Sequence, residues 1–264
     1  MKDDFWHVRN DFLTSEPRQV VRGIFDDDKK NYQKAELELS KEVALLDDAL
    51  TLFVTSLRGG YHDVDKWRNN VSVKAAVAMA NSALNYLFLA RHAVMLGYFP
   101  ECRDLLRSCH ERITRCYLFF ADKEEAERFF SGKQIEQKDV RKKLSCILAS
   151  GNDEKQSEIL KMLQASYNHQ SQVVHPNLES LSARTDGPET EKLNERVVKY
   201  PIFGGMLSSD LGKSVIFAVI QATLFALKVI GVMFEETSGT WEKEFSRILQ
   251  SYNTFLNHAR EFTR

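Results

Sequence analysis

Apolar side chains recur three and four positions apart along most of the chain. The pattern begins with Leu39, Val43, Leu46, Leu50, Phe53 and Leu57, and is typical of one face of an amphipathic helix. The same spacing predicts further helices at residues 71–96, 100–120, 122–130, 135–149, 154–174, 214–234 and 241–262. Only 12 glycines and 5 prolines are present, so tight turns are scarce and a sandwich or barrel is disfavoured. We therefore expect an all-α protein folded as an antiparallel helical bundle.

Turn and cap residues delimit these helices. Gly59 and Gly60 follow the first helix, and Pro100 lies in the first turn of a later one, where proline is tolerated. Asp122 followed by Glu125 resembles a capping box. Residues 182–210 lack a pattern, and a stretch of that length is usually a lid, a binding loop or a disordered segment. We expect an N-terminal arm with some extra helix at 1–34, then a single bundle domain at 35–264.

The most apolar run, from Ser214 to Phe234, is long enough to cross a bilayer. Gln221 and Lys228 interrupt it, and a cationic side chain near the middle of a membrane is costly. We therefore predict a central buried helix, with Lys228 paired or extended to the surface. The acidic first residues lack the apolar segment of a signal peptide, so a cytoplasmic location without membrane contact is expected.

Composition adds two constraints. With 43% apolar and 28% charged residues the chain is globular in type, and 264 residues can bury a substantial core. The formal net charge of −1 provides no global attraction to nucleic acid, so any such contact needs a local patch.

Three of the four cysteines, Cys102, Cys109 and Cys116, are seven residues apart. On a helix their sulfurs are about 10 Å apart, too far to share one metal ion. We predict free cysteines on a core face, in a reducing compartment.

No motif of a well-marked enzyme class is present, and no metal or cofactor site is expected. One polar helix face, formed by Asn168, Ser171, Gln172 and His175, has the spacing i, i+3, i+4 and i+7. Its histidine could transfer protons near neutral pH. The alternative, which the local pattern favours, is a structural residue that interacts with the helix dipole at a terminus set by Pro176.

A second polar face lies on the helix predicted at 100–120. Its members are Arg103, Arg107, His110, Glu111 and Thr114. Arg107 and Glu111 are four apart and can pair. The face is either solvated, with one weak ion pair, or turned inward to orient a neighbouring helix.

Taken together, these stretches resemble an uncharacterised family of bacterial helical domains. The matching residues, in order, are Leu106-Arg-Ser-Cys-His-Glu111, Tyr117-Leu118, Asp122-Lys-Glu-Glu-Ala-Glu-Arg-Phe129 and Ser171-Gln-Val-Val-His-Pro176. That family is similar to the HEPN superfamily of helical bundles, which is common in toxin–antitoxin and phage-defence systems. The resemblance covers residues 84–181, under half of the chain.

The resemblance implies metal-independent RNA cleavage, without a cofactor, at a site shared across a homodimer. A histidine would transfer protons and an arginine would stabilise the charge on phosphorus. His175 matches the family histidine and Glu111 the upstream acid, but the family arginine falls on Asn168, which carries no charge. Arg107 would have to supply that charge instead.

Three hypotheses remain open. The first is an endoribonuclease, weak or dependent on a partner, which uses His175, Asn168, Glu111 and Arg107 and binds RNA through the basic residues Lys138, Arg141, Lys142 and Lys143. The second, which the missing arginine and the low net charge favour, is a module of the same ancestry that regulates a protein or RNA partner without catalysis. The third is a bundle that binds a small molecule.

Overall fold

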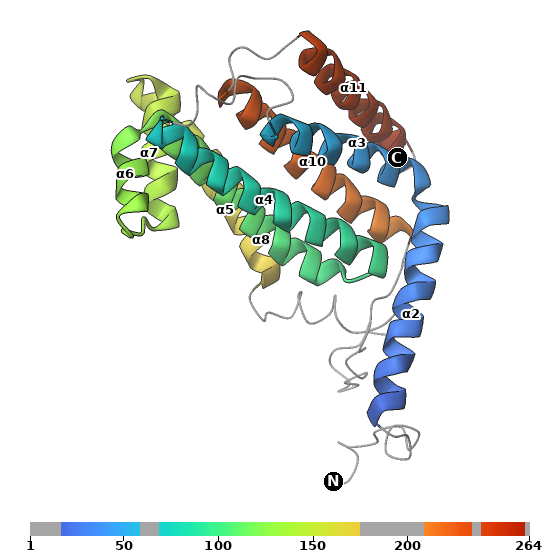
Figure 1. The fold of residues 1–264 in the computed structure, drawn as a ribbon. Helices are drawn as coiled ribbons and strands as arrows, with labels where there is room; N and C mark the ends of the chain where they lie inside the picture. The colour runs from blue at the N-terminus through green and yellow to red at the C-terminus, as the bar shows by residue number, and fades with distance from the viewer. Residues whose placement is uncertain (1–16, 59–68, 175–208, 234–238, 262–264) are drawn as a thin grey trace, which may run out of the picture.

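The all-α prediction is confirmed. The computed structural model describes residues 17–58, 69–174, 209–233 and 239–261, and every regular element in these ranges is an α-helix. In chain order the helices are α2 (Pro17–Glu38), α3 (Ser40–Leu57), α4 (Val71–Leu96), α5 (Phe99–Ala121), α6 (Lys123–Phe130), α7 (Gln137–Ala149), α8 (Asp153–Val174), α10 (Ser209–Met233) and α11 (Gly239–Glu261). Figure 1 shows them as a bundle around α4 and α5.

Caps at the helix ends explain why most bounds follow from local sequence. The Asn70 side chain accepts hydrogen bonds from the backbone N–H groups of Ser72 and Val73 at the start of α4. Gly97 ends α4 with φ of 81°, a left-handed conformation that costs glycine little. Asp122 accepts from the backbone N–H of Glu125 at 3.2 Å, which confirms the predicted cap of α6.

The helices α4 and α5 form a close antiparallel pair at the centre of the bundle (Figure 1). The buried face of α4 is rich in alanine: Ala75, Ala76, Ala80, Ala83, Ala90 and Ala93 are all buried. Small side chains let the two helix backbones approach each other. Arg112 of α5 adds a polar link, because its guanidinium lies over the Tyr86 ring of α4, 4.2 Å from the centroid.

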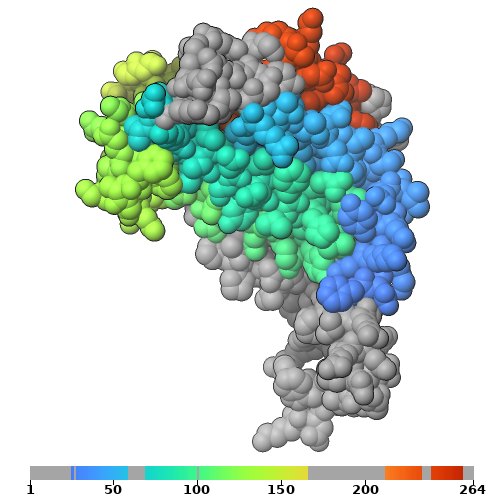
Figure 2. Space-filling view, in the orientation of Figure 1, coloured from blue at the N-terminus to red at the C-terminus, as the bar shows by residue number. Residues whose placement is uncertain are grey.

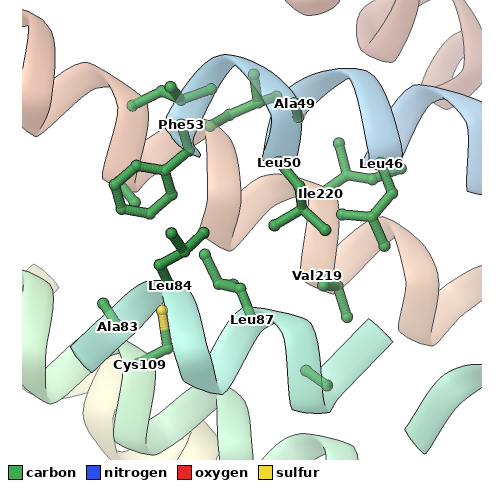
Figure 3. Close-up of a cluster of buried hydrophobic side chains, with 14 of the residues drawn as sticks. Leu46, Ala49, Leu50, Phe53, Ala83, Leu84, Leu87, Cys109, Val219 and Ile220 are labelled. Carbon is green, nitrogen blue, oxygen red and sulfur yellow. The ribbon is translucent and has the colours of Figure 1, made fainter. Parts of the chain in front are cut away.

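The main core lies where α3 and α10 cover this pair. In Figure 3, Phe53 of α3, Leu84 and Leu87 of α4 and Ile220 of α10 meet in one apolar cluster. Phe53, Leu87 and Ile220 have no exposed surface. On the outer side α11 packs against α3 and α10.

The apolar run predicted as a central helix is α10, which contacts α3, α4, α5 and α11. Its buried side chains include Ile216, Ile220, Leu227 and Ile230, whereas Gln221 and Lys228 are exposed. By length and composition α10 and α4 could each cross a membrane, but 56% and 44% of their apolar windows are buried within the protein.

A smaller second cluster lies at the far end of α4 and α5, under α6, α7 and α8. Its buried residues are Ala75, Leu118, Phe119, Ala126, Val140 and Leu144. In the space-filling view, α6 and α7 form one end of the visible face, and α4 runs across its middle (Figure 2).

Helix α2 extends across the boundary at residue 34 that the sequence suggested. Asn31 donates to the backbone carbonyl of Leu96 at 3.2 Å, and the Tyr98 hydroxyl donates to Asp28 at 3.0 Å. This part of the arm is therefore joined to the bundle. The irregular stretch predicted at 182–210 ends earlier than expected, because α10 begins at Ser209. Residues 175–208 lie outside the described part of the chain.

Candidate functional site

The polar face of α5 carries a row of charges. Glu111 lies between two arginines: its carboxylate is 3.3 Å from the Arg107 Nε and 3.8 Å from the Arg115 Nη1. The three side chains are between 21% and 23% exposed, so the face is neither fully solvated nor fully buried. The predicted pairing of Arg107 with Glu111 is confirmed.

His110, on the adjacent side of α5, is turned inward. Its ring stacks on Phe225 of α10 with centroids 5.9 Å apart and an interplanar angle of 16°. Burial lowers the pKa of His110, the Glu111 charge opposes this, and the positive charge of Arg141 lowers it further. The imidazole is therefore neutral at pH 7. Its Nδ1 is buried and has no hydrogen-bond partner among the described residues.

Thr114 and Arg115 join this face to α7. The Gln137 amide donates to the Thr114 hydroxyl at 2.9 Å, and that hydroxyl donates to the backbone carbonyl of His110 at 2.9 Å. The Arg115 guanidinium also reaches the backbone carbonyl of Ile135 at 3.4 Å. These contacts hold the start of α7 beside the C-terminal third of α5.

The other half of the predicted site is carried by α8, which packs against α5 and α7. It starts beside the end of α7 and runs back along α5 in the opposite direction (Figure 1). The backbone of Asn168 belongs to this helix, but its side chain is outside the described part of the structure. His175 follows the last residue of α8 and also lies outside the described residues.

Helix bounds show how the end of α8 relates to the charged row on α5. Leu163 of α8 packs against the second cluster, which contains Leu118 of α5. Helix α8 contacts α5 and runs antiparallel to it (Figure 1). Its last turn, which ends at Val174, therefore lies toward the Arg107 end of α5 rather than toward Ala121.

The four basic residues predicted as an RNA-binding patch do not share one surface. Arg141 is only 5% exposed, because it lies three residues before the buried Leu144, on the side of α7 that faces the bundle. Lys143 pairs with Glu125 of α6, whose side chain is 3% exposed. Lys138 and Lys142 are exposed, and Lys138 pairs with Glu136 at 2.8 Å.

The pairing of Lys143 is a structural requirement of α6. Glu125 lies in the first turn of that helix, and its carboxylate also accepts a hydrogen bond from the Arg128 guanidinium at 2.6 Å. Burial alone would raise the pKa of Glu125, but the hydrogen bonds and charges of Lys143 and Arg128 outweigh it and lower the pKa. Removing Lys143 would leave a buried carboxylate with less compensation.

Sequence analysis missed a lysine on α8. Lys138 and Lys142 line one side of an open groove between α7 and α8, and Lys161 lines the groove with them. The position of Arg141 could have been predicted, since it lies three residues before Leu144 and eight before Ala149, on the same face of the helix. The position of Lys161 could not, because it depends on how α8 packs against α7.

The chemistry available on the described residues is limited. No group of three or more metal-binding side chains occurs among them. The α5 polar face offers a charge-balanced row, a neutral histidine that stacks on a phenylalanine, and bridging hydrogen bonds. Such a set can hold helices in register, but it exposes no nucleophile paired with a base.

Comparison of the chain with protein-family models, with curated proteins and with solved structures finds no match.

Proposed function

We propose that this protein is a HEPN-like helical module that regulates a partner by binding to it, without catalysis. The HEPN-like ancestry and a role in phage defence or a toxin–antitoxin pair rest on the sequence resemblance described above. A cytoplasmic homodimer is part of the same proposal.

The observation that carries the proposal is the position of Glu111 between Arg107 and Arg115. Cleavage of RNA by a histidine requires a cation that stabilises the negative charge developing on the phosphoryl oxygens in the transition state. Asn168 cannot supply that charge, and the carboxylate of Glu111 already balances the guanidinium of Arg107 within its own helix. Of the four predicted RNA contacts, Arg141 is buried and Lys143 is paired with Glu125.

The alternative is a metal-independent endoribonuclease that uses His175. The direction of α8 favours it, because the helix runs antiparallel to α5 and its last turn lies toward the Arg107 end of α5. In that case Arg107 would have to exchange Glu111 for a phosphate when RNA binds.

A cleavage assay separates the two. Purified protein is incubated with tRNA and a structured RNA, beside His175→Ala, Arg107→Ala and a matched control, His92→Ala, which changes an exposed histidine of α4. If the proposal holds, none of the four proteins cleaves either RNA. Cleavage that His175→Ala abolishes and His92→Ala retains would contradict it and establish the ribonuclease.

The proposed location is tested by fractionation. Because more than half of the apolar window of α10 is buried against other helices, we expect the full chain in the supernatant after lysed cells are ultracentrifuged. Recovery in the membrane pellet after a carbonate wash would contradict this. Light scattering of the soluble protein tests the homodimer.

A further inference from the structure

An open groove lies between α7 and α8. Its lining residues are Lys138, Asp139 and Lys142 of α7 and Ser157, Leu160, Lys161, Gln164 and Ala165 of α8. The groove has a volume of about 690 Å³. Three lysines and one aspartate give it a positive charge, although the whole chain has a net charge of −1.

The lining is mostly apolar despite these charges. Leu160 and Ala165 contribute apolar surface, and the aliphatic stems of the lysines can extend it while their ammonium groups stay in water. Lys138 is paired with Glu136, but both side chains are about 70% exposed, so the pair is worth little and can be exchanged. The groove therefore combines an apolar floor with a cationic rim.

We infer that this groove binds an acidic amphipathic helix of a partner protein. Leucine-like side chains on one face of that helix would lie against Leu160 and Ala165, and flanking glutamates would pair with Lys142 and Lys161. This inference rests on the proposed function, since it names the chemistry of the partner.

A protein helix fits this lining better than an RNA strand. Sites for single-stranded nucleic acid combine basic residues with aromatic side chains on which bases stack, and no aromatic residue lines this groove. Asp139 would repel a run of phosphates, whereas a partner helix can place a basic residue opposite it. The apolar floor has no role in binding a phosphate backbone.

The test uses the full-length protein and a labelled 18-residue peptide. The peptide has leucines at helical spacing on one face, with glutamates beside them; its control is a peptide of the same composition in scrambled order. The protein variants are Lys142→Glu/Lys161→Glu, Leu160→Ser, and Lys243→Glu as a control on α11. Circular dichroism verifies that each variant is folded.

We expect the acidic peptide to bind, the scrambled peptide to bind at least about tenfold more weakly, and the double variant and Leu160→Ser to lose about tenfold or more in affinity. Lys243→Glu should bind like the unmodified protein. A peptide with lysines in place of the glutamates should bind Lys142→Glu/Lys161→Glu better than the unmodified protein, which a folding defect could not produce.

Two outcomes overturn the inference. One is failure of the acidic peptide to bind, or binding that none of the groove variants changes. The other is binding of a single-stranded RNA 20-mer that Lys142→Glu/Lys161→Glu abolishes while the peptide does not bind, which would make the groove a nucleic-acid site. Either result leaves the proposed absence of catalysis intact, because that is decided by RNA cleavage and His175→Ala.

Discussion

Burial determines the thiol reactivity of the cysteines on α5. Cys102, Cys109 and Cys116 are buried, as the spacing of seven predicted, and Cys146 on α7 is exposed. Burial raises the pKa of all three buried thiols, that of Cys109 to about 12. A buried thiol that stays protonated is a poor nucleophile.

We therefore expect one of the four cysteines to react with a thiol reagent such as DTNB at pH 8 in the native protein. All four should react in denaturant. The variant Cys146→Ser should remove the native reaction. Rapid reaction of more than one thiol in the folded protein would show that the reagent can reach the buried face of α5.

His110 makes stability depend on pH. Its pKa in the native state is below that of a free histidine, mainly because the ring is buried. The unfolded chain therefore takes up a proton near pH 6.5 that the native state does not, and the free energy of unfolding falls as the pH drops below that value.

His110 is expected to contribute at most about 1.4 kcal/mol per pH unit to the slope of the free energy of unfolding against pH. Urea denaturation between pH 7.5 and 5 should show a smaller decrease for His110→Phe, which keeps the stacking on Phe225, than for the unmodified protein. His110→Gln provides a second comparison. Equal slopes in all three proteins would mean that the imidazole titrates normally.

At the scale of helices, the contact between α10 and α11 depends on one glycine. A β-carbon at Gly231 would lie 2.7 Å from the Cη2 atom of Trp241. Trp241 has little freedom to move, because its Nε1 donates to the Ser56 hydroxyl at 2.8 Å and its ring stacks on Phe245 with centroids 5.1 Å apart.

Gly231→Ala should therefore lower the free energy of unfolding by about 1–3 kcal/mol, the usual cost of overpacking a core. The control is Gly239→Ala, since nothing lies within 4 Å of a β-carbon built there. Denaturant unfolding followed by circular dichroism measures both. A Gly231→Ala protein as stable as the control would mean that α11 can shift at no cost.

Helix bounds could be predicted well because they depend on neighbouring residues. The expected range 71–96 coincides with α4, and the expected range 154–174 differs from α8 by one residue. Asn70, Gly97 and Asp122 act on backbone groups only a few residues away, so their effect is visible in the sequence. The break between α2 and α3 at Leu39 was missed, since the apolar spacing continues through it.

At the scale of the molecule, the two apolar clusters should differ in stability. The larger cluster joins α3, α4, α5, α10 and α11, whereas the smaller one, under α6, α7 and α8, has far fewer buried side chains. Local opening costs less where less apolar surface is buried.

Hydrogen exchange should therefore be faster for the backbone amides of α6 and α7 than for those of α3 and α10. Mass spectrometry of peptic fragments measures the difference. Equal protection in both regions would indicate that the bundle opens as one unit.

The sequence by itself determined the helical class, most helix ends and the buried cysteine row, because these depend on the 3.6-residue period and on caps within a few residues. It also determined that Arg107 and Glu111 can pair, since residues four apart on a helix are neighbours. Only the tertiary structure decided that Lys143 pairs with Glu125 of α6 and that Lys161 joins Lys138 and Lys142 in one groove. Those positions depend on the register in which separate helices pack, and contacts between residues far apart in the chain set that register.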